Sequence, residues 1–535
     1  MKKALSIILA SCMTLSAMAQ LRYQNRPPEK RQSVSQLERD VQKMVMATAM
    51  IYNYYVDSVD SKRLAEDAIN GILKKLDPHS AYSNAQETKK FTEPLEGSFE
   101  GIGVQFNVLE DTLVVIQPVP KGPSEKVGIL AGDRIVSVND TAIAGVKMSR
   151  EEIMHRLRGK KGSHVDLGVV RREISDTLHF DVVRDKIPVN SVDAAYMVTP
   201  RIGLIRFNNF AQTTHAEVVE AIKKLRAQGM VDLIIDLQQN GGGYLQAAAD
   251  IASEFLAKND MIVYTRGRSV PNQEFRSSGS GLFTQGKVAV LVDEYSASAA
   301  EILSGAIQDQ DRGIVVGRRT FGKGLVQRPI ELPDGSMIRL TVAKYYTPSG
   351  RCIQKPYEKG DRRAYDRDVI NRYNNGELTN ADSIHFPDSL RFQTLREKRV
   401  VYGGGGIMPD YFVPLDTTKY SRCYREMSAK SIIINANLKY IDATRKELRK
   451  SYPTFKKFRE KFQVPQALVD SLMAQGEKQN IKPKDDAERQ TTQDNIRRII
   501  KALVARDLWD MSEYYSIVNE SSEIVMKGVE LLEKR

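Results

Sequence analysis

The chain has 535 residues, which exceeds one ordinary domain and predicts roughly three or four. Hydrophobic residues make up 41% of it, enough to build buried cores. The 79 Lys and Arg residues outnumber 67 Asp and Glu, and the resulting charge of +12 is spread along the chain. Dispersed charge argues against a nucleic-acid partner and favours, at most, a loose attraction to anionic membrane surfaces.

The first residues indicate export. Residues 1–3 are a short basic region, residues 4–10 are apolar, and Ala17-Met18-Ala19 has the small-x-small form of a signal-peptidase site. A signal peptide is therefore predicted for residues 1–19, with the mature protein in the periplasm or cell envelope. The alternative is lipoprotein processing that leaves Cys12 lipidated and the protein tethered to a membrane. The apolar segment before Cys12 is short for that pathway.

No later segment approaches the roughly 18 consecutive apolar residues of a membrane span. Beyond Cys12 the chain has two cysteines, Cys352 and Cys423, which could pair in an oxidising compartment if their Cα atoms come close enough. The Cys and His residues have no zinc-site spacing, so neither a metal nor another cofactor is expected.

The hydrophobic patterns divide the rest of the chain into four regions and predict a multidomain α+β protein. Residues 20–94 are a polar lead-in followed by two helical patterns, and residues 95–185 are a small β-rich module of short strands separated by Gly, Pro and Asp. Residues 186–415 alternate strand and helix, which predicts an α/β core, with an elaborated polar loop at 355–400. Residues 416–535 are helical.

A serine at the start of a predicted helix has two interpretations. Residues 288–307 place an apolar strand before Ser298 and a helix after it. As a helix cap, Ser298 would form a capping box with Glu301, three residues further on. As a nucleophile, it would be lifted out of the sheet by the strand-to-helix turn, with the helix N–H groups facing a developing oxyanion. Taken alone, this segment favours the cap.

Two other segments change the balance. Lys323 lies between two glycines, where packing gives a lysine little reason to be, although a solvated turn is the simpler interpretation. A lysine amine can activate a serine if a dry pocket lowers its pKa from about 10.4 toward neutrality. Gly241-Gly242-Gly243 follows a buried strand, and glycines allow the backbone to approach a ligand closely and turn its N–H groups inward.

The order of these motifs resembles the C-terminal processing peptidases, also called tail-specific proteases. The resemblance covers most of residues 60–415 and rests on three motifs: Asp-Leu-x-x-Asn-x-Gly-Gly at 236–243, Ser-Ala-Ser-Ala-Ala-Glu at 296–301 and Gly-Lys-Gly-x-x-Gln at 322–327. It implies a serine endopeptidase with a PDZ domain at 95–185 and an α/β protease core, similar to ClpP and crotonase folds, at 186–415.

The resemblance also implies roles for single residues. Ser298, rather than Ser296, becomes the nucleophile, and Lys323, 25 positions downstream, the general base. Gln327 would hold and orient the Lys323 amine. The oxyanion hole would use the backbone N–H of Ala299 and of Gly242, although another glycine in 241–243 is possible because this chain departs from the usual Asn-Pro-Gly-Gly.

In the PDZ domain, Gly101, Ile102, Gly103 and Val104 are implied to bind the terminal carboxylate of a peptide, which would add to the next strand. The implied substrates are proteins or peptides with exposed, rather apolar C-termini, and the PDZ domain is expected to gate the active site. The helical segments at 37–76 and 420–535 predict a homodimer interface or a seat for an adaptor protein. A non-catalytic PDZ scaffold is the alternative function; an acyl-thioester enzyme is disfavoured by the Ser–Lys pair.

Overall fold

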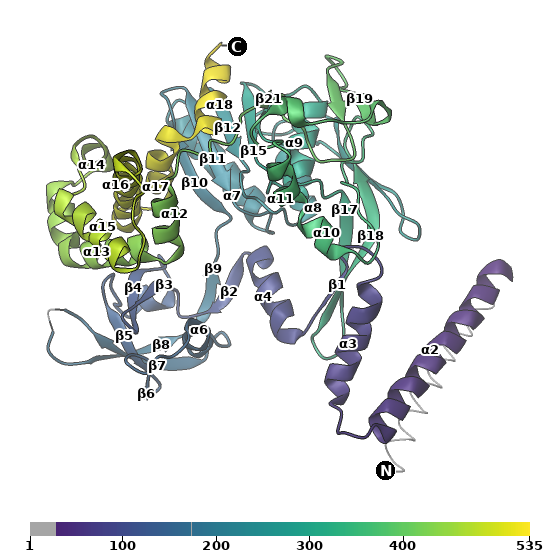
Figure 1. The fold of residues 1–535 in the computed structure, drawn as a ribbon, viewed down its shortest axis with the longest axis horizontal. Helices are drawn as coiled ribbons and strands as arrows, with labels where there is room; N and C mark the ends of the chain where they lie inside the picture. Colours follow the sequence, from purple (N-terminus) through teal and green to yellow (C-terminus); the bar gives the residue numbers. More distant parts are fainter. Residues whose placement is uncertain (1–27, 173, 535) are drawn as a thin grey trace.

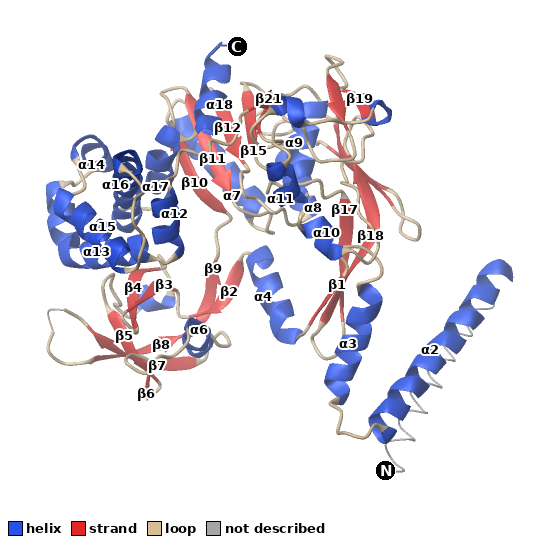
Figure 2. Cartoon of the chain, viewed as in Figure 1, coloured by secondary structure: helices blue, strands red, loops and turns tan. Residues whose placement is uncertain are grey.

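The computed structural model describes residues 28–172 and 174–534 (Figure 1). The predicted signal peptide and Cys12 lie outside these residues. Within the described ranges, no helix is both long and apolar enough to cross a membrane. The predicted α+β, multidomain architecture is confirmed: helical regions at both ends flank a β-rich module and a mixed α/β core, the one for which a protease is predicted (Figure 2).

The described part of the N-terminal region, from residue 28, contains three helices. Helix α2 (Pro28–Tyr54) projects from the body of the molecule (Figure 1), and its side chains from residue 36 onward are exposed. Helix α3 (Ser61–Leu73) begins at Asp60, whose side chain accepts the N–H of Lys62. Strand β1 (Ala81–Ser83) and helix α4 (Ala85–Glu96) follow. Because β1 pairs with a strand of the protease core, this region is built into the core.

The β-rich module has the strands expected from its alternating sequence. The main sheet has the order β3-β4-β5-β7-β8, with β6 paired to β5, and β2 pairs separately with β9. Helix α6 covers the sheet, and Leu113, Ile135 and Leu167 are fully buried between them. The elements are β2 (Ser98–Gly101), β3 (Val104–Leu109), β4 (Thr112–Pro118), α5 (Pro123–Lys126), β5 (Arg134–Val138), β6 (Thr141–Ala142), α6 (Arg150–Leu157), β7 (His164–Val170), β8 (Leu178–Val183) and β9 (Asp185–Pro188).

The protease core is organised around a six-stranded sheet of order β10-β11-β12-β15-β16-β21, parallel except for β10. Its strands are continuous apolar runs because both faces are covered, by α7, α8 and α9 on one side and α18 on the other. The elements are β10 (Val192–Met197), β11 (Ile202–Phe207), α7 (Thr214–Ala227), β12 (Asp232–Asp236), α8 (Leu245–Ser253), β15 (Val288–Val292), α9 (Ala299–Asp309), β16 (Ile314–Gly317) and β21 (Tyr411–Phe412).

A second sheet forms the other wall of the core. Strand β18 (Met337–Tyr346) lies between β1 and β13 (Met261–Arg266), and β14 (Gln273–Arg276) completes the row. Among the described residues, strand β17 (Leu325–Glu331) pairs only with β18, so one of its edges has no neighbouring strand there.

The segment at 355–400 is more regular than the predicted polar loop. It contains α10 (Arg362–Asp366), α11 (Asp368–Asn374), two short 3-10 turns (Ala381–Ser383 and Asp388–Leu390) and a hairpin of β19 (Arg391–Gln393) and β20 (Val400–Tyr402). Polar contacts hold it: the buried Arg372 guanidinium donates to the Thr320 carbonyl at 3.0 Å and to the Arg319 carbonyl at 2.6 Å. Such contacts leave no apolar periodicity in the sequence.

The C-terminal helices form a domain with its own apolar core. Helix α13 contacts the β-rich module, where Asp442 pairs with Arg134 at 2.8 Å, and α17 contacts the protease core, where Ser512 Oγ accepts the Ala195 N–H at 3.1 Å. The domain therefore bridges the two (Figure 1). Cys352 and Cys423 are both free thiols. The helices of this domain are α12 (Arg422–Ala429), α13 (Ile432–Ser451), α14 (Phe455–Lys461), α15 (Gln466–Lys478), α16 (Asp486–Leu508) and α17 (Met511–Val518). The last helix, α18 (Glu523–Lys534), packs on the six-stranded sheet instead.

Candidate active site

Ser298 lies on a strained turn between β15 and α9. Its φ of +56° and ψ of −114° fall in a region that residues with a Cβ rarely occupy. Ser296, the other serine of the motif, is buried and donates its hydroxyl to the Leu237 carbonyl at 2.8 Å. Ser298 instead lines a cavity of about 300 Å³. The turn thus presents Ser298, and not Ser296, to the cavity.

Lys323 lines the same cavity from the loop between β16 and β17. Burial first and then the positive charge of Arg339 lower the pKa of its amine, while Glu301 and Asp77 partly oppose the change, and together they bring the pKa to about 8. With a pKa of about 8, about a tenth of Lys323 is neutral at pH 7 and about half at pH 8. Burial is the main cause of this lowered pKa.

Glu301 connects the turn of Ser298 to the loop of Lys323. Its buried carboxylate accepts the backbone N–H of Ser298 at 2.8 Å, of Gly322 at 2.7 Å and of Lys323 at 2.9 Å, and the hydroxyl of Thr320 at 2.5 Å. Burial raises its pKa to about 7 although these four donors oppose the rise. The capping-box pattern identified Glu301, but only as a partner of Ser298.

Tyr345 on β18 provides a second link. Its buried hydroxyl lies 2.6 Å from the Lys323 carbonyl and 3.2 Å from the Ser298 carbonyl, and the single proton favours the shorter contact. Burial raises the pKa of the Tyr345 phenol well above its usual value, so the group stays a donor. Nothing in the sequence motifs pointed to Tyr345.

The side chains of Ser298 and Lys323 line the same cavity without contacting each other. Within the described part of the chain, no hydrogen bond joins Ser298 Oγ to Lys323 Nζ. Gln327 lines the same cavity from β17; its Nε2 lies 3.4 Å from Thr341 Oγ1 and 3.5 Å from the Leu325 carbonyl. The structure brings the three predicted residues together and leaves room between them.

The predicted oxyanion donors flank Ser298. Ala299 begins α9, and its N–H has no hydrogen-bond partner among the described residues. The N–H of Gly242 donates to Asn240 Oδ1 at 2.9 Å, so Gly242 could bind an oxyanion only after releasing that bond. The N–H groups of Gly241 and Gly243 make no such bond within the described ranges.

Only glycine fits at position 242. Its φ is +100°, and a Cβ placed there would lie 2.7 Å from Ser298 Cβ and 3.0 Å from the Ala299 nitrogen. The glycine loop therefore approaches the turn of Ser298 as closely as backbone can, which is the arrangement an oxyanion hole needs.

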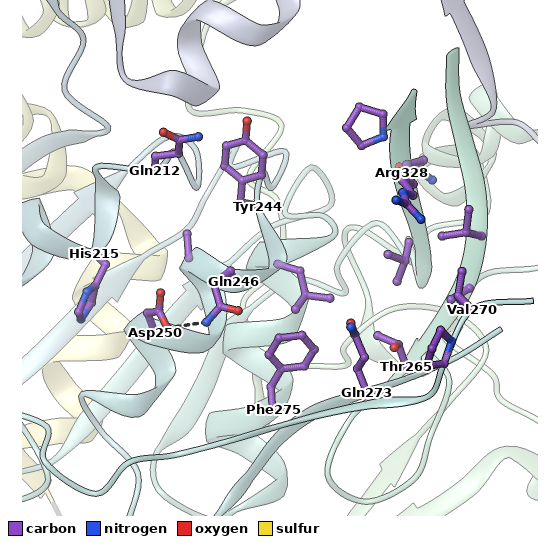
Figure 3. Close-up of a pocket in the computed structure, with 18 residues that line it drawn as sticks. Gln212, His215, Tyr244, Gln246, Asp250, Thr265, Val270, Gln273, Phe275 and Arg328 are labelled. Atoms are coloured by element: carbon purple, nitrogen blue, oxygen red, sulfur yellow. Dashed lines mark hydrogen bonds between the residues drawn. The ribbon is translucent and has the colours of Figure 1, made fainter. Parts of the chain in front are cut away.

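A larger cavity of about 770 Å³ adjoins the first and shares Tyr244, Val326 and Gln327 with it. In Figure 3, Tyr244 lies on one side of this cavity and Arg328 of β17 on the other, with Phe275 and Gln273 along its lower border in the view. The unpaired edge of β17 runs along both cavities. An extended peptide could follow this strand into the site.

The predicted carboxylate-binding residues lie at the mouth of a groove in the β-rich module. Gly101, Ile102, Gly103 and Val104 line a cavity of about 270 Å³, with β3 on one side and α6 on the other. Strand β3 is at the edge of its sheet, and Gly103 has a φ of +74°. The edge strand beside α6 can accept a peptide as an added strand.

Family models match four parts of the chain. Residues 201–361 match peptidase family S41, residues 101–190 a PDZ domain, residues 8–88 the N-terminal domain of the activating protease CtpB, and residues 423–510 a family of unknown function.

Characterised relatives cover most of the chain. It is 34% identical to carboxy-terminal processing protease CtpB of Bacillus subtilis, over 61% of this chain and 68% of the relative. It is 36% identical to a carboxy-terminal-processing protease of Bartonella bacilliformis, over 56% of this chain and 69% of the relative. The solved photosystem II D1 C-terminal processing protease is 28% identical, covering 58% of this chain and 89% of its own with a TM-score of 0.33.

The matches and the fold define a serine-type peptidase that carries a PDZ domain. The chain belongs to the carboxy-terminal processing proteases of peptidase family S41.

Proposed function

We propose that the protein is an exported endopeptidase that cleaves substrates through a Ser298 acyl-enzyme, with neutral Lys323 as the general base. The observation that carries this proposal is the shared cavity: Ser298 on a strained turn, Lys323 with its pKa lowered to about 8, and both loops joined by Glu301. Gln327 orients the Lys323 amine from β17.

In the first half-reaction, the Lys323 lone pair takes the proton of Ser298 Oγ as Oγ bonds to the substrate carbonyl carbon. The N–H of Ala299 and of a glycine in 241–243 stabilise the tetrahedral oxyanion. Collapse breaks the C–N bond, and the Lys323 ammonium gives its proton to the leaving amine. In the second half-reaction, water attacks the ester, Lys323 takes a water proton, and that proton returns to Oγ as the acid product leaves.

Cleavage of a protein with an unstructured, apolar C-terminus tests the dyad. We expect Lys323→Ala and Ser298→Ala, each shown to be folded by circular dichroism, to lose activity by about a thousandfold or more. Cleavage by folded Lys323→Ala at the parental rate would refute the role of Lys323. The alternative function, a non-catalytic PDZ scaffold, requires that the parent protein itself cleaves nothing.

The PDZ groove is proposed to bind the free C-terminus of the substrate at residues 101–104. Backbone N–H groups there would donate hydrogen bonds to a terminal carboxylate, which accepts them more strongly than a neutral terminal amide does. Matched peptides with a free or amidated C-terminus, measured by fluorescence anisotropy, should therefore differ in Kd by at least tenfold. Equal affinities for the two peptides would contradict the proposed role of residues 101–104. Equal cleavage rates for substrates with a free and an amidated C-terminus would contradict it too.

Export is proposed from residues 1–19 alone. Cell fractionation with N-terminal sequencing of the mature protein should find Gln20 at the new N-terminus in the periplasm or envelope. A membrane-bound form with lipid on Cys12 would establish the alternative.

Helix α2 is proposed to pair with α2 of a second copy. Exposed Leu37, Val41, Met44 and Ile51 follow the alternating four- and three-residue spacing of a coiled-coil seam, with Thr48 completing it. Light scattering should show a dimer that Val41→Asp and Met44→Asp convert to a monomer. A monomeric parent would leave an adaptor protein as the remaining predicted partner of this helix.

A further inference from the structure

A chain of polar groups leads from Gln327 to the N-terminal region. Gln327 and Thr341 are directly opposite each other on β17 and β18, beside a bulge in the pairing. Gln327 Nε2 lies 3.4 Å from Thr341 Oγ1, and the Thr341 hydroxyl donates to Asp77 Oδ1 at 2.9 Å. Asp77 lies between α3 and β1, a segment to which the sequence motifs gave no role in the site.

Asp77 can only accept hydrogen bonds near neutral pH. It receives the N–H of His79 at 2.9 Å, the N–H and hydroxyl of Ser80 at 3.0 Å and 2.6 Å, and the hydroxyl of Thr341. Burial pushes its pKa upward, but these hydrogen bonds outweigh burial and hold the pKa below its usual value. The carboxylate is therefore ionised when Lys323 titrates.

The proton of Thr341 decides the orientation of the Gln327 amide. A hydroxyl has one proton, and Thr341 gives it to Asp77, so only its lone pairs remain for Gln327. The second group near that end of the amide, the Leu325 carbonyl at 3.5 Å, is also an acceptor. Two acceptors select the NH₂ end of Gln327, which leaves Oε1 for the cavity that Gln327 shares with Lys323.

We propose that Asp77 and Thr341 are positioning residues that fix the Gln327 amide with its oxygen available to the Lys323 amine. The inference rests on the proposed function, in which Gln327 orients Lys323. It gives the N-terminal region a direct part in the site, because β1, immediately after Asp77 and Ser80, is hydrogen-bonded to β18.

The expected pH effect follows from the charges around Lys323. Those charges are Arg339 on β18, Glu301 on α9 and Asp77; His79 is neutral because burial and the nearby Lys323 lower its pKa to about 3. Gln327 Oε1 stabilises the ammonium more than the neutral amine, since hydrogen bonds to charged groups are the stronger ones. Loss of its orientation should lower the pKa of Lys323 and move the rising limb of the pH–rate profile to lower pH.

Thr341→Val tests the chain of polar groups from Asp77 to Gln327, because it removes the hydroxyl and keeps the shape of the side chain. We expect kcat/KM to fall roughly three- to tenfold, which is the cost of one hydrogen bond. The fall should appear in kcat and not in KM, and the rising limb of the pH–rate profile should move to lower pH. Thr341→Ser should restore both values. Asp77→Asn, whose NH₂ can redirect the Thr341 hydroxyl, should lower kcat/KM like Thr341→Val and provides a second variant if the valine form is unstable. It also removes a negative charge that raises the pKa of Lys323, so its pH limb should move further than that of Thr341→Val.

A double-mutant cycle separates positioning from general loss of structure. If Thr341 acts through Gln327, adding Thr341→Val to Gln327→Ala should cause no further loss. The inference would be overturned if the losses of activity caused by Thr341→Val and Gln327→Ala multiplied in the double variant. A parental pH profile in both Thr341→Val and Asp77→Asn would overturn it as well. Parental activity and pH profile in Gln327→Ala would instead refute the proposed role of Gln327, and activity in Ser298→Ala the proposed mechanism.

Discussion

The carboxylate of Glu301 accepts the backbone N–H of Lys323 at 2.9 Å, across 22 residues of sequence. The same carboxylate oxygen accepts the N–H of Ser298 at 2.8 Å. A side chain first recognised as part of a helix cap thus sets the spacing between the proposed nucleophile and its base. Its environment also makes the site sensitive to pH.

Glu301 should contribute a pH dependence to stability. Burial raises its pKa from 4.5 to about 7, so the folded state holds the proton more tightly than the unfolded state. This tighter proton binding stabilises the folded state in full below pH 4.5. The stabilisation, up to about 3 kcal/mol, is lost as the pH rises through about 7. Urea unfolding at several pH values should show this decline for the parent and not for Glu301→Gln. The same decline in both proteins would mean that another group causes it.

Arg339 should set the pH at which the enzyme works. Burial, and then the charge of Arg339, lowers the pKa of Lys323, and the proposed base must be neutral, so activity should rise with a midpoint near pH 8. Arg339→Gln should raise the pKa of Lys323 and move that midpoint to higher pH. Arg328→Gln is the matched control, because Arg328 lines the adjoining cavity and should leave the midpoint in place. A midpoint unmoved by Arg339→Gln contradicts the electrostatic account.

Gly242→Ala should abolish cleavage. The new Cβ would lie 2.7 Å from Ser298 Cβ at a φ of +100°, so the glycine loop or the Ser298 turn must move. Cleavage should fall at least a hundredfold, as when an oxyanion donor is lost, with the melting temperature of the helical domain unchanged. Gly241→Ala is the control: a Cβ there meets nothing within 4 Å, and the loss should be much smaller. Equal losses would mean that Gly242 has no special closeness to Ser298.

The C-terminal helical domain should hold the PDZ domain in place. Asp442 of α13 pairs with Arg134 at 2.8 Å, and its carbonyl accepts from Arg172 at 2.9 Å. Asp442→Ala should weaken docking by about 1 kcal/mol and increase the radius of gyration in solution scattering. High salt should have the same effect on the parent and little on the variant. Identical scattering of the two proteins at low salt would show that this pair does not hold the PDZ domain.

Much of the fold could be predicted because burial leaves regular patterns. The apolar runs at β11, β12 and β15 and the alternating strands of the β-rich module are such patterns. The regular structure of the segment at 355–400 could not be predicted, since buried Arg372 of α11, bonded to backbone carbonyls, resembles a surface residue in the sequence.

The site residues likewise fall into those that the sequence indicated and those that only the structure revealed. Ser298 and Lys323 were candidates from their own segments, and the family resemblance selected them together with Gln327; the structure places all three around one cavity. Tyr345 and Asp77 were missed because they reach the site only through tertiary contacts. Gly242 was selected by family resemblance, but its N–H is bonded to Asn240, a detail that depends on side-chain geometry.

Covalent labelling tests the central claim most directly. The parent protein, treated with a fluorophosphonate at several pH values, should gain one adduct that peptide mass spectrometry places on Ser298, at a rate that rises with a midpoint near pH 8. Labelling should vanish in Ser298→Ala and become slow in Lys323→Ala. An adduct on another residue, or labelling of Ser298 that is equally fast without Lys323, would contradict the Ser298–Lys323 mechanism.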